Sequence, residues 1–285
     1  MSETKMITPC LWFDGNGEEA AAFYVSLFAN SSIGTVARFD GVNAVTVEFT
    51  LDGSKFVALN GGPQYRFTPA ISFFVICESV EEIDSLWAKI TDGGGVMMPL
   101  DKYEWSDRYG WGSDRFGLGW QLMLGPVASA GQKIVPCLLF VGDQYGRGEE
   151  AINLYTSVFP DSPIDGILRY GANEPGREGT VKHAQFALRG GKFTIMDGPG
   201  EHAFGFSEAL SFIVSCDDQA EIDHYWSSLT ANGGAESMCG WLKDPFGVSW
   251  QIVPANIGEL LSTPAAMQAM FGMRKIDIAG LTHAG

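Results

Sequence analysis

Apolar and polar positions alternate along some stretches of the chain and recur at helical spacing along others. The segments VEFTLDGSKFVALNG (47–61) and AISFFV (70–75) are rich in Val, Phe and Ile, which is typical of strands. Residues 18–28 and 80–90 carry apolar side chains three or four positions apart, which predicts two helices. Asn16 is a candidate N-cap for the first helix, with Glu18 and Glu19 in its first turn. The predicted order is strand, helix and three strands, followed by a second such module.

This pattern is written twice. Residues 110–122 read GWGSDRFGLGWQL and residues 240–252 read GWLKDPFGVSWQI, with seven of thirteen positions identical. Other segments match in the same order, such as ITPCLWF (7–13) with IVPCLLF (134–140). Self-similarity over most of a chain indicates a tandem repeat. We predict a first domain at 5–125, a linker at 126–132, a second domain at 133–255 and a C-terminal helical tail at 256–285, with two βαβββ modules in each domain.

Several of these segments resemble the vicinal-oxygen-chelate superfamily of glyoxalase I, bleomycin-resistance proteins and extradiol dioxygenases. The resemblance is to its PhnB-like branch, often named after a 3-demethylubiquinone-9 3-methyltransferase domain. It is carried by ITPCLWFDGNGEEAAAFY, MPLDKYEWSDRYGW, DRFGLGWQ, DPFGVSWQ and MQAMFGMRKIDIAGL. It implies an α+β fold in which each domain's two modules form one curled eight-stranded sheet around a ligand. Single-copy relatives resemble either half, so we expect a pseudo-dimeric monomer or a homodimer of the tandem chain.

The resemblance also allows the superfamily's metal-ligand positions to be inspected. Metal-binding members use His, Gln or Glu on the first and last strands of each module. Here those positions fall on Pro9 and Pro136, Ala58 and Ile195, Ser72 and Ser211, and Gln121 and Gln251. Proline cannot ligate through its side chain, and one amide with one hydroxyl is a poor set for a divalent cation. We therefore expect no metal and no cofactor, with Gln121 and Gln251 bonding a ligand or the backbone.

Candidate ligand-binding residues come from two further places. On the third strand of each copy, Glu48 in the first and His183 and Gln185 in the second lie on the polar face, which we expect to point into the cup. The first copy alone has a long loop before its closing strands, and this loop supplies Tyr103, Trp105, Arg108 and Tyr109. Aromatic faces with one guanidinium suit a planar or anionic molecule, although these aromatics could instead seal the cup.

Composition and charge exclude several partners. The chain has 34 acidic and 18 basic residues and a net charge of −16, which disfavours nucleic acid and anionic membranes. We find neither a signal peptide nor a membrane span, so we expect a cytoplasmic protein. Cys10 and Cys137 match between copies, as do Cys77 and Cys216, which favours core thiols over catalytic ones, whereas Cys239 has no counterpart. In the tail, Met267, Met270 and Met273 are spaced like one helix face that packs on a domain or subunit.

The chain lacks the sequence motifs of several enzyme classes. It has no P-loop and no GxSxG motif, and we expect no cofactor site of the α/β methyltransferase type. Our leading hypothesis is a metal-independent small-molecule-binding protein that sequesters or transforms its ligand, with catalytic residues unknown. One alternative is a metal-dependent lyase, isomerase or dioxygenase with metal at Glu48 or His183. A second is an assembly subunit whose cups are filled by side chains.

Overall fold

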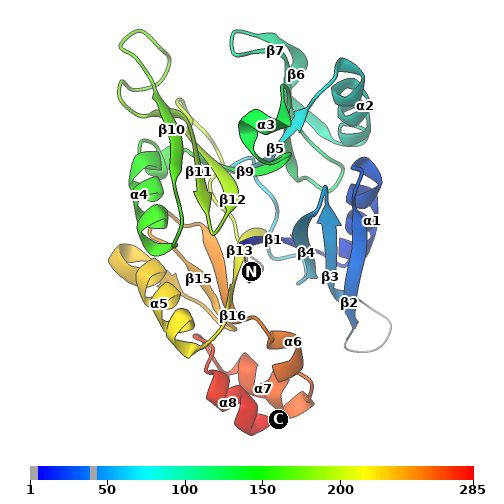
Figure 1. Cartoon of the computed structure of the whole chain (residues 1–285), viewed down its shortest axis with the longest axis vertical. Coiled ribbons are helices and arrows are strands. Elements are labelled where there is room, and N and C mark those ends of the chain that lie inside the picture. The colour runs from blue at the N-terminus through cyan, green and yellow to red at the C-terminus, as the bar shows by residue number, and fades with distance from the viewer. Residues whose placement is uncertain (1–5, 39–43) are drawn as a thin grey trace.

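The chain folds as four βαβββ modules, two in each repeat (Figure 1). The computed structural model describes residues 6–38 and 44–285. The first repeat contains β1 (Thr8–Phe13), α1 (Gly17–Leu27), β2 (Ser32–Arg38), β3 (Ala44–Leu51), β4 (Ser54–Asn60), β5 (Ile71–Cys77), α2 (Val80–Ile90), β6 (Gly95–Tyr103), β7 (Ser106–Ser113) and β8 (Gly119–Leu124). The second contains β9 (Ile134–Phe140), α4 (Gly148–Val158), β10 (Ile164–Arg169), β11 (Val181–Leu188), β12 (Gly191–Asp197), β13 (Leu210–Cys216), α5 (Gln219–Thr230), β14 (Ala235–Glu236), β15 (Trp241–Lys243) and β16 (Ser249–Pro254). The predicted element order of both repeats is confirmed.

The strands form two open eight-stranded sheets, and each sheet takes one module from each repeat. Sheet A runs β14-β15-β16-β13-β1-β4-β3-β2, and sheet B runs β10-β11-β12-β9-β5-β8-β7-β6. The predicted fold class is confirmed, but the two modules of one repeat do not share a sheet as we expected. The two repeats meet where β1 pairs antiparallel with β13 and where β5 pairs antiparallel with β9. Two equivalent antiparallel seams relate the repeats as an isologous contact relates two subunits.

Helices α1, α2, α4 and α5 cover the outer face of the sheets and bury the apolar core there (Figure 1). Trp120 and Trp250 are fully buried in it. The carboxylate of Asp114 accepts a 2.8 Å hydrogen bond from Trp120 Nε1, and Asp244 accepts one of 2.9 Å from Trp250 Nε1. Backbone N–H groups of the turn between each Asp and its Trp donate to the same carboxylates. Most of the repeated GW…DxFGxxWQ stretch therefore builds a buried turn.

The start of α1 differs from the expectation. Asn16 makes no side-chain capping hydrogen bond. Asn60 Oδ1, at the end of β4, instead accepts a 2.8 Å bond from Gly17 N, so the helix start is tied to the neighbouring strand. A Cβ at Gly17 would lie 2.8 Å from that oxygen, which explains the glycine. By contrast, Ser79 caps α2 through a bond from Glu82 N.

The segments outside the repeats are helical. The predicted linker contains α3 (Val127–Ala130), and the tail forms α6 (Ile257–Leu260), α7 (Pro264–Phe271) and α8 (Ile278–Ala284). The three tail methionines do not share one helix, because α7 ends before Met273. Met270 and Met273 pack against the core. None of the helices in the described part of the chain has the length and apolarity that crossing a bilayer requires.

The tail also completes the edge of sheet A. Cys239 N and Gly240 N donate hydrogen bonds of 2.8 and 2.7 Å to the carbonyls of Met273 and Arg274. In the first repeat the equivalent positions are Tyr109 and Gly110, and there β6 is the flanking strand. Strand β14 has only two residues and cannot reach so far. The segment after α7 thus takes the place that β6 fills in sheet B.

Candidate functional site

Gln121 lies on the inner face of sheet B, opposite the face that α2 and α4 cover, and is 3% exposed. Its Nε2 donates a 2.8 Å hydrogen bond to Ser72 Oγ on β5, and its Oε1 accepts a 2.5 Å bond from the Tyr109 hydroxyl on β7. Parallel pairing of β5 with β8 and antiparallel pairing of β7 with β8 bring these three side chains together. Both functional groups of the amide are therefore already bonded within the protein.

The residues beside Gln121 differ by one position from those placed by the resemblance. Cys137 pairs with Ser72 in register, so Cys137, not Pro136, faces the same side as Gln121. Ile195 belongs to the buried core under the helices, and its neighbour Thr194 takes the inner position. Sheet A shows the same shift, with Cys10 in place of Pro9 and Val57 in place of Ala58. Our assignment of these four positions was wrong, because side chains alternate faces along a strand.

The corrected set does not suit a metal ion. Around Gln121 it consists of a thiol, two hydroxyls and an amide. Burial raises the pKa of the Cys137 thiol to about 11, so it stays protonated at neutral pH, whereas a ligating cysteine must be a thiolate. Over residues 6–38 and 44–285, no three His, Cys, Asp or Glu side chains lie close enough to hold a metal ion.

The long segment of the first repeat is a β-hairpin and not a loop. Strands β6 and β7 pair along it with several register shifts and turn at Glu104–Trp105 (Figure 1). Tyr103 and Trp105 stack with ring centroids 5.0 Å apart, and both contact Tyr109 at 5.6 Å. Trp105 is 57% exposed, whereas Tyr109 is buried. Three of the four residues predicted here thus form one aromatic wall beside Gln121.

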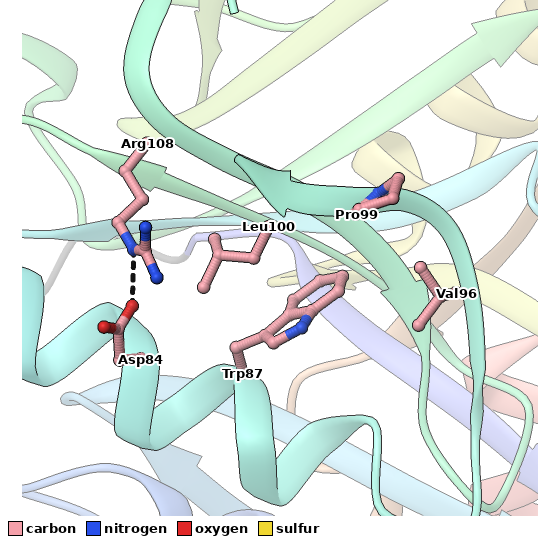
Figure 2. A pocket seen from close by; sticks show the side chains of 6 residues that line it. All are labelled: Asp84, Trp87, Val96, Pro99, Leu100 and Arg108. Atoms are coloured by element: carbon pink, nitrogen blue, oxygen red, sulfur yellow. Dashed lines mark hydrogen bonds and ion pairs between the residues drawn. The ribbon is translucent and has the colours of Figure 1, made fainter. Parts of the chain in front are cut away.

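Arg108 points away from that wall. Alternation along β7 puts its side chain on the outer face, where it forms an ion pair with Asp84 on α2 (Figure 2). Trp87 and Leu100 line the same outer hollow. The predicted combination of aromatic rings with the Arg108 guanidinium therefore does not exist on one face.

On the opposite wall, β11 carries His183 and Gln185. The ring of His183 meets Phe74 edge-on at 6.0 Å, and Phe74 is 6.4 Å from Tyr109, so one phenyl ring separates the two walls. Burial lowers the pKa of His183, which favours its neutral form. Gln185 Nε2 is held by Asp165 and by the carbonyl of Ala130 at the end of α3.

The equivalent face of sheet A is built differently. Gln251 Nε2 donates a 2.9 Å bond to Ser211 Oγ, but the position of Tyr109 is taken by Cys239, whose thiol donates to the carbonyl of Met270 at 3.6 Å. Trp241 and Trp12 meet at 5.9 Å. Glu48 is exposed on β3 at the far side of this sheet. Hence Glu48 and Gln251 lie in sheet A, apart from the candidate residues of sheet B.

Sequence reasoning missed Phe74, Cys137 and Thr194 on the floor of sheet B. Phe74 lies in a continuous apolar run, in which no alternation reveals the inward face. The matched cysteines of the two copies, which fall at equivalent positions, were a signal for Cys137. A buried thiol is equally typical of the core, so this signal did not identify the inner face.

Comparisons with known proteins agree with this architecture. The profile of the family described as 3-demethylubiquinone-9 3-methyltransferase matches residues 5–123 and again residues 132–253. The PhnB protein of Bacillus cereus is 38% identical over 42% of this chain and 99% of its own, with a TM-score of 0.40. A variant of glyoxalase I from Zea mays is 10% identical over 89% of this chain and 94% of its own, with a TM-score of 0.57. A comparison with curated proteins returned no match.

The glyoxalase I likeness supports the fold alone, whereas the two profile matches cover most of the sequence. The chain therefore belongs to the 3-demethylubiquinone-9 3-methyltransferase (PhnB-like) family and consists of two tandem copies of its domain in the vicinal-oxygen-chelate fold.

Proposed function

We propose that the chain binds a small, planar, uncharged molecule on the inner face of sheet B, between the β6–β7 hairpin and β11, without a metal ion. The observation that carries the proposal is the pair of aromatic walls one phenyl ring apart, with Tyr103, Trp105 and Tyr109 on one side and His183 on the other. Aromatic walls with a few convergent polar groups are typical of small-molecule sites. The cytoplasmic location and the ligand's identity remain predictions.

The polar groups on this face favour an uncharged ligand. Gln121, Ser72 and Tyr109 are neutral, and burial keeps His183 neutral as well. The only guanidinium that we expected here, that of Arg108, is paired with Asp84 on the outer face. The ammonium of Lys192 beside Gln185 is already paired with Asp165, so it offers an anion little compensation for leaving water, a loss that costs several kcal/mol or more. The His183 ring and the exposed ring of Trp105 offer hydrogen bonding and stacking instead, whereas both groups of the Gln121 amide are already bonded within the protein.

Neither methyl transfer nor metal-dependent chemistry is proposed. The glycine-containing turn at residues 15–17 connects β1 to α1, but the next strand, β2, lies at the edge of sheet A and pairs antiparallel with β3, unlike the parallel βαβ unit that binds a nucleotide cofactor. The groups around Gln121 do not suit a metal. The second candidate is a face closed by its own side chains, in which the hairpin serves only as structure. It is favoured by the burial of Tyr109 over Gln121, at 4% and 3% exposed.

The test is calorimetric titration with a panel of uncharged bicyclic aromatics such as coumarin, together with mass spectrometry of small molecules released on denaturation. We expect saturable binding that Trp105→Ala and His183→Ala weaken about tenfold or more, since each removes a wall. Arg108→Ala is the matched control and should leave the affinity unchanged. Absence of any saturable binding would favour the closed face, and a loss at Arg108 equal to that at Trp105 would contradict the assigned geometry.

A further inference from the structure

A second hollow lies in the first repeat, at the end of β1 and away from the inner face of sheet B. It measures about 480 Å³ and lies between the segment after β4 and the turn at Asp114–Gly117. A volume of this order is that of a small-ligand site. We call it the β1 groove and define it by Trp12, Tyr65, Arg66, Phe67, Arg115 and Phe116.

The aromatic side chains of the β1 groove are held in place by bonds and packing. Trp12 Nε1 donates a 2.7 Å hydrogen bond to the carbonyl of Gly62, and the Trp12 ring meets Tyr65 edge-on at 5.0 Å. A Cβ at Gly61 would lie 2.1 Å from the Trp12 ring, so only glycine permits this approach. Phe67 and Phe116 both pack against Phe13. The walls are therefore preorganised for a flat ring.

Two guanidinium groups line the same groove. Arg115 lies over the rings of Phe23 and Phe116, 4.5 and 5.1 Å from their centroids, and its link to Glu19 is long and exposed at 3.4 Å. Arg66 is exposed and forms no ion pair with any residue of the described ranges. The backbone around Arg66 is tied to the second repeat, because its carbonyl accepts a 2.8 Å bond from Ser207 Oγ.

Two carboxylates also lie at the β1 groove, and they do not neutralise it equally. Asp114 is 2% exposed and accepts bonds from Trp120 and from the backbone of its turn. It is thus occupied by the fold. Asp14 remains at the exposed rim. The two guanidiniums give the β1 groove donors for an anion, which the exposed carboxylates of Asp14 and Glu19 oppose only in part because both are open to water.

The second repeat shows which parts of the groove belong to the fold. There Phe140 packs against Phe206 and Phe246, as Phe13 packs against Phe67 and Phe116. The aromatic scaffold is therefore common to both repeats. The equivalents of Trp12, Arg66 and Arg115 are Leu139, Gly205 and Pro245, so the ring donor and both guanidiniums are confined to the first repeat.

The second repeat does have one guanidinium near this place, and it is fully engaged. Arg147 lies over Phe246 at 4.5 Å. It also forms paired 2.8 Å bonds to Glu150 and donates to Gln144 and to the carbonyl of Pro245. Its donors are thus satisfied by the protein, whereas the Arg66 side chain is exposed and has no ion pair within the described ranges.

We infer that the β1 groove binds a planar aromatic carboxylate, with the ring against Trp12 and Tyr65 and the carboxylate at Arg66 and Arg115. A guanidinium binds a carboxylate through two parallel N–H donors, and an aromatic ring contributes apolar contact area. This site is separate from the proposed uncharged-ligand site in sheet B, so either can exist without the other.

The test uses 2-naphthoate as the probe and follows tryptophan fluorescence and calorimetry on the full chain. We expect one saturable site that Arg66→Gln and Arg115→Gln each weaken at least tenfold, with weakening at high salt and poorer binding of the uncharged 2-naphthamide. Arg169→Gln, an exposed arginine paired with Glu149 in the second repeat, is the matched control. Trp105→Ala, in the other site, should also have no effect.

Two outcomes would overturn the inference. One is the absence of saturable 2-naphthoate binding by the unaltered chain. The other is an affinity that Arg66→Gln and Arg115→Gln leave within twofold of the parent, or that the Arg169→Gln control lowers equally. Both arginine positions are exposed, so circular dichroism should show that the variants keep their fold.

Discussion

The Tyr109 hydroxyl donates a 2.5 Å hydrogen bond to Oε1 of Gln121, and both side chains are buried on the inner face of sheet B. The second repeat keeps the glutamine as Gln251 but has Cys239 where Tyr109 would be. The two inner faces therefore differ at this position. This pair of residues also links the hairpin to the floor of the sheet, so its loss has a measurable consequence.

Tyr109→Phe should destabilise the protein by about 1–3 kcal/mol, because it leaves a buried amide oxygen without a donor while preserving the ring. Urea unfolding followed by circular dichroism measures the change. The matched control is Tyr103→Phe, since the Tyr103 hydroxyl bonds the carbonyl of Pro99 at an exposed site and its loss should cost less. Equal costs for both variants would mean that the Gln121 bond has no special weight.

His183 predicts a pH dependence of stability. Burial lowers its pKa in the folded state, so protonation favours the unfolded chain. Above the ordinary imidazole pKa of about 6.5, His183 is neutral in both states and the free energy of unfolding keeps its full value. It decreases as the pH falls towards the lower pKa that His183 has in the folded state. Free energies of unfolding between pH 8 and pH 5 should therefore fall more steeply in the parent than in His183→Asn. The exposed His283→Gln should keep the parent's slope.

The tail should contribute to stability through Ile276, which is fully buried. Ile276→Ala removes apolar contacts and leaves a cavity, for which about 2–5 kcal/mol is typical. Truncation after Ala255 should be more severe, because Cys239 N and Gly240 N also lose their acceptors. Thermal unfolding and sedimentation measure both variants. A truncated chain that melts and sediments as the parent does would show that the tail is dispensable.

Separation of the repeats should expose their shared seams. A fragment of residues 1–126 has β1 and β5 without their partners β13 and β9. We expect each repeat expressed alone to form homodimers or aggregates, since the open strand edges and apolar surface require a partner. Co-expression of both repeats should restore a one-to-one complex. Light scattering after size exclusion distinguishes these species, and a stable monomer of either repeat would contradict the interleaved sheets.

The modules could be predicted because their signals are local. Alternation in residues 47–51 and helical spacing in residues 80–90 each depend on neighbouring positions in the chain. Which modules share a sheet depends on contacts across the chain, such as Thr8 with Ile213, and no local pattern encodes such partners. Asn16 shows the same limit, because Asn60 on another strand provides the bond to the helix start.

The site could be predicted only in part, for a related reason. Gln121 and Ser72 lie together on one face, where their side chains bond each other, and the binding role of Gln121 stays a prediction. The inner position of β4 was assigned to Ala58 instead of Val57, and a slip of one residue moves a side chain to the other face. Arg108 was placed with the aromatics because the segment read as a loop, whereas a strand separates adjacent side chains.

The interleaved sheets also constrain how the two repeats can diverge. Each inner face takes half of its strands from each repeat, so a change confined to one repeat alters one half of both faces. If a whole repeat were replaced with that of a relative, unmatched modules would meet at the β1–β13 seam of sheet A and also at the β5–β9 seam of sheet B. Inheritance should therefore act on the pair as a unit, with specialisation appearing first at exposed side chains outside the paired strands, such as that of Arg66.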